Sequence, residues 1–525
     1  MRLALAQVNP CVGDLQGNVA RCLQAIDAAR ARGADLVVLP EMAIPGCPPR
    51  DILLDPSFVH AVSEATTDLA LRAAGGPPVL VGTLVRSGRR APDHPGLYNA
   101  AVLLDCGAAR LVAAKRLLPD RDVFFESRWF LPGPALPPVL IAGTRVGVLL
   151  SDDLCDEGHE IHPGAEGIAA GAELLLCLAA SPYQRQIQAQ RLHHARRQRC
   201  PLAYVNLCGA NDELIYDGRS FVLDAGGGLV AQLDGFAEQV RVIDLDTAAP
   251  VESQAELVES QAELVEPRAE PAEQELYRAL VLGVRDFCRK NGQERAFLGL
   301  SGGIDSAVVA AIAAEALGPE RITALAMPSR YTDPRSTTSA RDLARALSIG
   351  FEVVDLQRLH AAAEDILGEH VRLDGTVAEN VQPRIRALIL MAFVNRHGGL
   401  LLNTSNKTEL ALGYGTLYGD TAGTLCPIAD LTKPEVIALA RWIDAQRCAI
   451  PRFILERPPS AELEPDQVDP FDYPTISPAV EQLVRGNRSN LALRRSEHKR
   501  WHMGVILKVS PKAFGTGRLI PITRR

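Results

Sequence analysis

The sequence predicts an α/β protein with two domains. A chain of 525 residues is too long for a single hydrophobic core. In each half, short apolar runs alternate with longer amphipathic stretches, which is the pattern of strands and helices in α/β folds. A glutamate-rich segment of low complexity separates the halves. We therefore expect domains at residues 1–247 and 275–525, joined by a linker at residues 248–274.

Short apolar runs in the N-terminal half predict strands, because such runs fit a buried pleated sheet. Between them, residues 18–32 and 184–198 show the apolar periodicity of helices. The strand runs are LALAQV, ADLVVLPE, PPVLVGTLV, NAAVLLD, RVGVLL, AELLLCLA and LAYVNLCG. In sheets of such α/β proteins, ligands bind at the carboxyl ends of the strands.

The segment between the halves carries the sequence VESQAEL twice in tandem and is rich in glutamate. It has too few apolar side chains to form a core, so we expect a solvated linker. Beyond it, the runs RAFLGL, RITALAMP, FEVVDL and GLLLNTS predict buried strands that alternate with helices.

Charge and composition exclude several classes of protein. The net charge of −8 gives no general electrostatic reason to bind nucleic acid. The eleven cysteines form no CxxC pair, which argues against a disulfide framework or a zinc cage. No apolar run reaches the roughly 18–20 residues that a membrane span needs, and the N-terminus has a strand pattern and not that of a signal peptide. We expect a soluble, cytoplasmic protein.

The stretch AFLGLSGGIDSAVVAAIAAEALG predicts a strand, a tight turn and a helix. Gly302 and Gly303 let the backbone close around an anion, and the new helix directs free N–H groups at it. Ser301 and Ser306 add hydroxyl donors, and Asp305 is placed to hold a magnesium ion. The lysine of GxxxxGK[ST] is missing, which excludes a P-loop. A turn of this kind is either structural or a site for a pyrophosphate leaving group.

The motif SGGIDS resembles the signature of the ATP-pyrophosphatase group, and later segments make this half similar to NAD synthetases. These segments are ENVQPRIRALILMAF, NTSNKTELALGYGTLYGDTAG, PIADLTKPEV, ILERPPSAELEPDQ, SEHKR and VSPKAFG. The resemblance implies a doubly wound parallel-sheet domain. It also implies a reaction in which deamido-NAD attacks ATP, forms an acyl-adenylate and releases pyrophosphate. Ammonia then displaces AMP and gives NAD, with Mg²⁺ offsetting phosphate charge.

The same resemblance implies roles for individual residues. It makes Asp305 and Glu409 the magnesium carboxylates. It places Asn380, Glu409, Asp420 and Lys512 at deamido-NAD. The positions that it implies for ATP binding are Gly299, Leu300, Ser301, Gly302, Gly303, Ile304, Asp305, Ser306, Thr404 and Lys433.

The N-terminal half is similar to the carbon–nitrogen hydrolase (nitrilase) family, whose fold precedes the synthetase in glutamine-dependent NAD synthetases. The similarity lies in LVVLPEMAIPGCPPRD, KRLLPDRDVFFESRWFLPG, VGVLL, AASPY and GRSFVLDAGGGLVA. It implies a four-layer α-β-β-α sandwich that releases ammonia from glutamine. It also implies that Glu41 is a general base and that Lys115 stabilises the tetrahedral intermediate, with Glu126 as a further acid.

The nucleophile position differs from this family, whose Cys-Glu-Asp-Ile-Trp stretch is Ser-Asp-Asp-Leu-Cys here. Ser151 therefore stands in the place of the thiol, and a hydroxyl is a weak nucleophile unless a base such as Glu41 activates it. Two positions that hold glutamine in the family also differ. Arg121 replaces a tyrosine and Ile187 replaces a lysine, whereas Ser181 remains. Together these changes indicate decay or repurposing of the glutaminase.

Two other interpretations of this stretch are weaker. Cys155 lies four residues beyond the nucleophile position, so the turn would have to be remodelled before its thiol could act there. His159 and His162 lie in HEIH, which is not the HExxH zinc signature, so a solvated loop is expected.

We therefore predict an NAD synthetase, a ligase that uses ATP, Mg²⁺ and deamido-NAD and takes ammonia as its nitrogen donor. Its nitrilase-like half is expected to be inactive or altered as a glutaminase, and the resemblance implies a homo-oligomer. One alternative is a fully glutamine-dependent synthetase that uses Ser151. The others are a nucleotide-binding regulatory protein without turnover and a different amide-forming ligase of the ATP-pyrophosphatase group.

Overall fold

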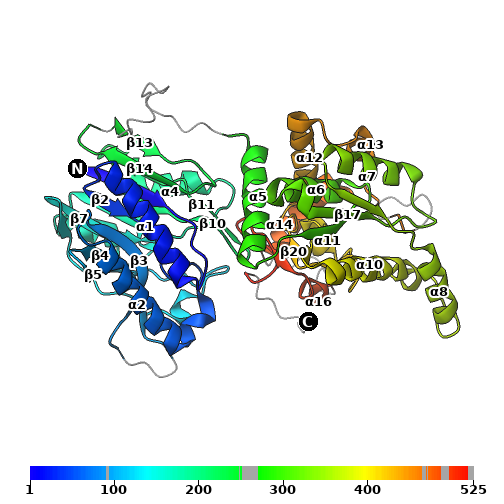
Figure 1. Ribbon diagram of the computed structural model, residues 1–525, viewed down its shortest axis with the longest axis horizontal. Coiled ribbons are helices and arrows are strands. Elements are labelled where there is room, and N and C mark those ends of the chain that lie inside the picture. Colours follow the sequence, from blue (N-terminus) through cyan, green and yellow to red (C-terminus); the bar gives the residue numbers. More distant parts are fainter. Residues whose placement is uncertain are drawn as a thin grey trace. The chain divides into compact units, whose positions relative to one another are not determined.

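The structure is a computed structural model that describes residues 1–89, 94–247, 249–250, 270–460, 462–463, 469, 471–485 and 496–517. The chain divides into two compact units (Figure 1). The first unit comprises Met1–Asn211 and Ile215–Ala269, and the second comprises Asp212–Leu214 and Glu270–Arg525. The tandem VESQAEL repeat lies outside the described residues. Within the ranges described, no helix is both long and apolar enough to cross a membrane.

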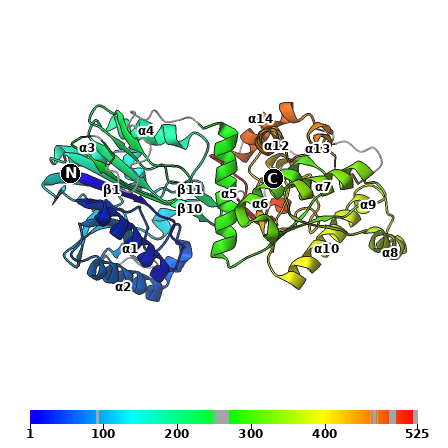
Figure 2. The same cartoon turned by 45° about the horizontal axis from the view of Figure 1, so that its top comes forward.

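The first unit is the predicted four-layer α-β-β-α sandwich (Figure 2). Helices α1 (Leu15–Ala31) and α2 (Pro56–Arg72) cover a seven-stranded sheet of order β15-β14-β1-β2-β3-β4-β5. Helices α3 (Pro163–Ala169) and α4 (Ile187–Arg197) cover a six-stranded sheet of order β13-β12-β9-β8-β7-β6. Each sheet thus packs one face on helices and the other face on its partner sheet.

The strands of this unit include every one predicted for the N-terminal half. The seven-stranded sheet contains β1 (Arg2–Gln7), β2 (Leu36–Val38), β3 (Val79–Arg86), β4 (Leu97–Asp105), β5 (Ala108–Ala114), β14 (Gln239–Asp244) and β15 (Ala249–Pro250). The six-stranded sheet contains β6 (Val139–Ile141), β7 (Thr144–Leu150), β8 (Leu174–Ala179), β9 (Leu202–Asn206), β12 (Phe221–Leu223) and β13 (Leu229–Gln232). A separate two-stranded sheet pairs β10 (Cys208–Asn211) with β11 (Leu214–Asp217).

Strand β8 shows why its sequence, LLLCLA, is apolar throughout. Alternate side chains of a strand point to opposite faces of its sheet. Leu174, Leu176 and Leu178 belong to the core between the two sheets. Leu175 and Cys177 belong to the core beneath α4. Because both faces are buried, every position of this strand is apolar.

The second unit is built on a parallel sheet of order β18-β17-β16-β19. Its strands are β16 (Ala296–Gly299), β17 (Ile322–Ala326), β18 (Gly350–Val353) and β19 (Leu400–Leu401), and a second small sheet pairs β20 (Leu425–Cys426) with β21 (Val505–Ile506). The chain adds β17 and β18 on one side of β16 and β19 on the other. The strand order therefore reverses between β16 and β19, and the crevice at such a reversal is where doubly wound sheets bind ligands.

Helices surround this sheet. The helix α10 packs on one face against Phe297, Leu325 and Leu401, while α6 contacts β16 and β17 and packs with α5 and α12. The helices are α5 (Ala272–Lys290), α6 (Ile304–Leu317), α7 (Pro334–Ala346), α8 (Gln357–Gly368), α9 (Thr376–Glu379), α10 (Val381–His397), α11 (Lys407–Leu412), α12 (Lys433–Arg447), α13 (Arg452–Glu456), α14 (Tyr473–Val484) and α16 (Glu497–Arg500). One expectation needs correction: the strand in FEVVDL is not buried, because β18 is the edge strand and its Glu352 and Val353 are exposed.

Candidate functional site

The turn after β16 is built for a close backbone approach. Gly302 has a φ of +80°, and a Cβ atom there would lie 2.4 Å from the carbonyl oxygen of Ser336. Only glycine satisfies both constraints. Gly303 then precedes the buried helix α6, and its N–H donates to the Ser301 hydroxyl at 3.2 Å. The Ser306 hydroxyl lies 3.3 Å from that of Ser301, so hydroxyl and backbone donors gather at one helix N-terminus.

The loop after β19 is fastened to this turn by Asn406. The Asn406 side chain accepts the N–H of Glu409 at 3.0 Å, and the Glu409 carboxylate accepts the N–H of Asn406 at 3.2 Å, which is a capping box at the start of α11. The same side chain donates to Asp305 Oδ1 at 3.0 Å. Asn406 is fully buried. One asparagine thus brings Asp305 and Glu409 to the same place.

A buried lysine completes this arrangement. Lys433 is the first residue of α12, is 3% exposed, and forms an ion pair with Asp305. Burial lowers the pKa of Lys433, but the charges of Asp305 and Glu409 outweigh burial and leave that pKa above its usual value. Burial, followed by repulsion from Asp305, raises the pKa of Glu409 to about 8. The site therefore joins two carboxylates and one ammonium group.

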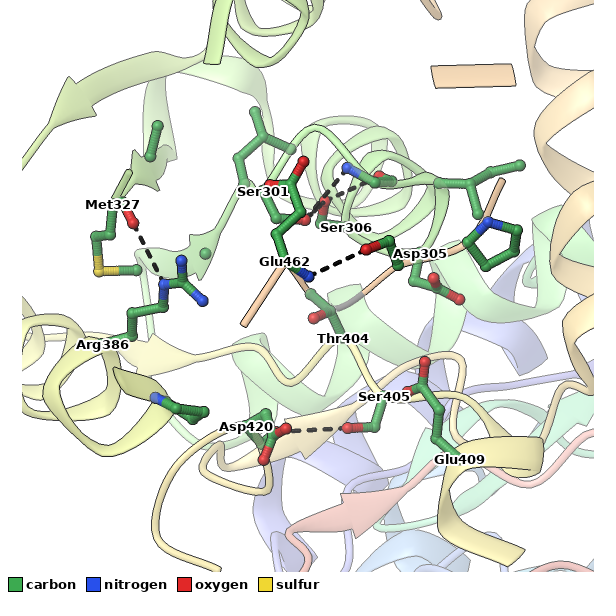
Figure 3. Close-up of a pocket in the computed structure, with 18 of the residues that line it drawn as sticks. Ser301, Asp305, Ser306, Met327, Arg386, Thr404, Ser405, Glu409, Asp420 and Glu462 are labelled. Carbon is green, nitrogen blue, oxygen red and sulfur yellow. Dashed lines mark hydrogen bonds between the residues drawn. The ribbon is translucent and has the colours of Figure 1, made fainter. Parts of the chain in front are cut away.

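These residues line a cavity of about 300 Å³ (Figure 3). Its wall contains most of the positions predicted for ATP, namely Gly299, Leu300, Ser301, Gly303, Ile304, Asp305, Ser306, Thr404 and Lys433. Gly302 does not line it, because its position against Ser336 faces the protein. The cavity also holds Arg386 and Arg457, two cations that sequence reasoning missed. Burial lowers the pKa of Arg386, whose Nε donates to the Met327 carbonyl at 3.3 Å.

The four positions predicted for deamido-NAD are only partly brought together. Glu409 and Asp420 line the cavity. Asn380 does not line it but is linked to Asp420, since Thr416 donates its hydroxyl to Asn380 and its N–H to Asp420. The Lys512 ammonium donates to the carbonyl of Gly517, and this residue is not part of the cavity wall. The role of Lys512 stays a prediction.

Asp305 and Glu409 fit a magnesium ion. Mg²⁺ takes hard oxygen ligands and is usually held by one or two protein carboxylates together with phosphate oxygens. Two carboxylates beside the SGGIDS turn supply that set, and repulsion from Asp305 adds to burial in raising the pKa of Glu409. Among the residues that the structure describes, no group of three or more His, Cys, Asp or Glu side chains is placed to hold a metal.

The first unit contains a second buried polar cluster, around Ser151. Ser151 follows β7 with a φ of +35°, a left-handed conformation unusual for serine. Its hydroxyl donates to Glu41 Oε2, and the N–H of Ala180 donates to both Ser151 Oγ and Glu41 Oε2 at 2.9 Å. The amide of Asn99 donates to the other Glu41 oxygen. The structure thus brings Ser151 and Glu41 together.

Lys115 lies in the same cluster and is 2% exposed. Its ammonium lies 3.2 Å from Glu41, 2.8 Å from Glu126 and 3.2 Å from Asp152. Burial raises the pKa of Glu126 to about 8, even though Lys115 opposes this shift. The charges of Lys115 and Arg121 overcome the effect of burial and keep the pKa of Asp152 below its usual value.

Asp153 holds the turn in place. Its carboxylate accepts the N–H groups of Arg116 and Leu117 at 2.9 Å and that of Leu150 at 3.3 Å. These bonds fix the end of β7 against the segment that follows Lys115. Burial raises the pKa of Asp153 to about 6.

The three predicted glutamine-pocket positions differ in their exposure and in their partners. Arg121 has an exposed side chain and pairs with Asp152 at 2.6 Å. Ser181 follows Ala180, and its hydroxyl accepts a hydrogen bond from the buried Arg191 at 3.2 Å. Ile187 is the first residue of α4 and offers no charge to a ligand.

Cys155 and the loop after it offer no rival chemistry. Burial raises the pKa of the Cys155 thiol to about 12, so it is protonated at neutral pH and poorly nucleophilic. His162 pairs with Asp156 at 3.0 Å. In the same loop, Glu157 forms an ion pair with Arg197 at 2.7 Å.

Sequence reasoning missed several of these contacts. Asn406 carried a signal, because Asn followed three residues later by Glu before an apolar run marks a capping box. Asn99 and Arg386 carried none: each lies on a separate element far along the chain from the residue that it contacts.

The chain matches two family models, carbon–nitrogen hydrolase over residues 2–252 and NAD synthase over residues 276–495. It is 36% identical over 562 residues to a glutamine-dependent NAD(+) synthetase of Synechocystis sp., covering 99% of this chain and 98% of the relative. It is 37% identical over 569 residues to one of Rhodobacter capsulatus, covering 100% and 98%. The structure of glutamine-dependent NAD+ synthetase from Acinetobacter baumannii in complex with adenosine diphosphate superimposes with a TM-score of 0.78 at 28% identity, over 99% of this chain and 98% of the other.

Proposed function

Because the chain belongs to the glutamine-dependent NAD(+) synthetase family, we propose that its second unit joins ammonia to deamido-NAD through an acyl-adenylate. The protein is an NAD(+) synthetase, a ligase that forms a C–N bond. The observation that carries the proposal is the cavity in which the SGGIDS turn, Asp305, Glu409 and Lys433 converge.

In the first step, a carboxylate oxygen of deamido-NAD attacks the α-phosphorus of ATP and the bond to pyrophosphate breaks. The developing pyrophosphate charge needs donors fixed in advance. The N-terminus of α6 with the hydroxyls of Ser301 and Ser306 supplies such donors, and Lys433 adds a positive charge. In the second step, ammonia attacks the acyl carbon, AMP leaves, and the nitrogen loses a proton to give the amide.

Asp305 and Glu409 would hold the magnesium ion. When bound, Mg²⁺ offsets the charge of the phosphate oxygens. Lys433 already pairs with Asp305, so its ammonium is held beside the metal position before ATP arrives. Asn406 orients Asp305 through its other oxygen.

We also propose that ammonia, and not glutamine, is the efficient nitrogen donor. Four donors already engage the Glu41 carboxylate, namely Ser151, Asn99, Lys115 and Ala180. The Ser151 hydroxyl is one of these donors, but a hydroxyl is a far weaker nucleophile than the thiol that the family carries at this position. The hydrogen bond from Ser151 to Glu41 favours the alternative, in which Glu41 accepts the hydroxyl proton while the oxygen attacks glutamine.

The test is NAD formation from ATP, Mg²⁺ and deamido-NAD, with either ammonium or glutamine as donor. We expect rapid formation with ammonium, matched by pyrophosphate release that other carboxylic acids do not elicit. Asp305→Asn should abolish it. Comparable rates with glutamine that Ser151→Ala removes would establish the alternative. Binding of ATP and deamido-NAD without product would instead indicate a regulatory protein.

The homo-oligomeric state implied by the resemblance and the domain boundary at residues 248–274 stay predictions. Sedimentation of the full chain measures the oligomeric state. Limited proteolysis measures the boundary, because cleavage within residues 248–274 should release two folded fragments.

A further inference from the structure

Asn380 stands at the N-terminus of α10 but does not cap that helix. Asparagine is among the residues that most favour an N-cap, where the side-chain oxygen accepts a free N–H of the first turn. The Asn380 side chain makes no such bond. Its oxygen instead accepts the hydroxyl of Thr416 at 2.5 Å. The side chain of Asn380 therefore serves a contact outside its own helix.

The amide nitrogen of Asn380 keeps both of its N–H donors. Among the residues that the structure describes, Thr416 is the only hydrogen-bond partner of the Asn380 side chain. Asn380 is also half-buried and not fully enclosed. An amide NH2 group donates and does not accept. A ligand at this nitrogen must therefore present an acceptor, such as a phosphate, carboxylate or ribose oxygen of deamido-NAD.

Thr416 is placed to orient this amide, because its own backbone is fixed. Thr416 is 5% exposed, and its carbonyl accepts the Thr421 hydroxyl at 2.9 Å. The N–H of Thr416 donates to Asp420, whose side chain lies at the nucleotide cavity (Figure 3). The Thr416 hydroxyl thus joins Asn380 to the loop that carries Asp420.

The loop itself does not depend on that hydroxyl. Lys499 donates to two loop carbonyls at 2.8 Å, and Asn403 donates to two others at 2.7 and 2.9 Å. These carbonyls belong to Gly413, Gly415, Asp420 and Ala422. Loss of the Thr416 hydroxyl leaves all four bonds in place. It should therefore release the Asn380 amide and leave the loop where it is.

We propose that Thr416 is a positioning residue for deamido-NAD: its hydroxyl fixes the Asn380 amide so that the two N–H donors face an acceptor of that substrate. This inference rests on the proposed function and on the role that the sequence predicts for Asn380. Loss of the hydroxyl should weaken the binding of deamido-NAD and spare that of ATP, because Asn380 does not belong to the cavity wall that holds the ATP positions.

The experiment compares Thr416→Val with Thr416→Ser in the full-length protein. Valine keeps the shape of threonine but removes the hydroxyl, whereas serine keeps the hydroxyl and removes only the methyl group. The readouts are the KM values for deamido-NAD and ATP, with ammonium as donor, and the Kd for deamido-NAD from titration calorimetry. The matched control is Thr421→Val, which removes a buried hydroxyl from the same loop and leaves Asn380 bonded.

We expect Thr416→Val to raise the KM and Kd for deamido-NAD by about 3-fold to 10-fold, which corresponds to the loss of one hydrogen bond. The kcat and the KM for ATP should change little, because the lost interaction is a ground-state contact with one substrate. Thr416→Ser and Thr421→Val should bind deamido-NAD as the wild type does. Asn380→Ala should weaken binding at least as much, and Thr416→Val should add nothing in that background.

A wild-type Kd in Thr416→Val would overturn the inference, as would equal losses in Thr416→Val and Thr416→Ser. A purely structural role of the hydroxyl would raise the KM for ATP as well, and its effect would persist in full in the Asn380→Ala background. Either result would also overturn the inference. If Thr416→Val does not fold, Thr416→Ala decides in the same way.

Asn380→Asp tests whether this side chain acts as a donor. A carboxylate has no N–H and repels an anionic acceptor, so Asn380→Asp should bind deamido-NAD no better than Asn380→Ala. Tighter binding by Asn380→Asp would contradict the inference. Failure of the wild type to form NAD would refute the reaction of the second unit, but the calorimetric comparison needs no turnover and would still decide the role of Thr416.

Discussion

Replacing Asn406 should separate the two tasks of this side chain. It caps α11 through the N–H of Glu409, and it donates to Asp305 Oδ1. Asn406→Ser keeps an oxygen at the cap but cannot reach Asp305. Asn406→Ala loses both contacts. The two variants therefore differ by the cap alone, and Asn406→Ser differs from the wild type by the bond to Asp305.

The structure sets the size of each effect. Loss of an N-cap costs about 1 kcal/mol of the free energy of unfolding. Loss of a hydrogen bond to a charged partner costs about 1.5–3 kcal/mol, and Asn406 is fully buried, so water does not replace it. We expect Asn406→Ser to lose about 1.5–3 kcal/mol by the same principle and Asn406→Ala about 1 kcal/mol more. At about 2–4 °C per kcal/mol for a domain of this size, Asn406→Ala should melt about 5–15 °C lower.

Scanning calorimetry of the second unit's transition measures these differences, and titration with Mg²⁺ and ATP measures the consequence for the site. Binding should weaken in both variants, because Asp305 loses the group that orients it. Asn291→Ser is the matched control, since Asn291 donates to the Phe287 carbonyl on an exposed surface. The reasoning is refuted if Asn406→Ser equals the wild type in both melting temperature and Mg²⁺ affinity.

Three further predictions concern the second unit. Because Mg²⁺ requires ionised Glu409, whose pKa is about 8 in the free protein, binding should release a proton and tighten as pH rises from 6 to about 8; calorimetry in two buffers of different ionisation heat measures the proton. The raised pKa of Glu409 affects the free energy of unfolding in the opposite direction. In the free protein, the contribution of this group to that free energy falls as pH rises through about 8. Gly302→Ala should destabilise the unit and weaken ATP binding, because the added Cβ atom would lie 2.4 Å from the carbonyl oxygen of Ser336. The control Gly292→Ala, at φ +64° with open space around it, should cost only the backbone strain. Equal losses in the two variants would contradict this prediction. Lys407→Met should lower the free energy of unfolding by about 3–5 kcal/mol in denaturant titrations, since it leaves the fully buried Asp430 carboxylate without a cationic partner. A wild-type midpoint would disprove that.

Much of the fold was accessible from the sequence because its strands carry strong patterns. The run LLLCLA predicted a strand, and β8 is one, buried on both faces. The run FEVVDL predicted a buried strand although β18 is an exposed edge strand, because local composition does not reveal how many neighbours a strand has. The short strands β6 and β12 were not predicted, since their few residues hold no recognisable period.

The candidate sites also contain some features that the sequence predicts and others that it does not. Residues inside contiguous motifs, such as Asp305 and Ser306, were predictable because the turn and the helix that place them are adjacent in sequence. Contacts between distant elements were not. That Lys115 engages three carboxylates depends on how β5, η2 (Glu126–Arg128) and η3 (Ser151–Leu154) meet in space, and on side-chain conformations that no spacing records.

The double burial of β8 also determines how this part of the molecule exchanges hydrogen with solvent. Amide protons protected by one core are released when that core opens locally, but those of a strand shared by two cores are released only when the whole unit opens. Ala180, whose N–H contacts Ser151, directly follows this strand. We therefore expect the backbone donor at the serine to be anchored to a slowly exchanging segment, while Arg121 in the same cluster has an exposed side chain that pairs with Asp152.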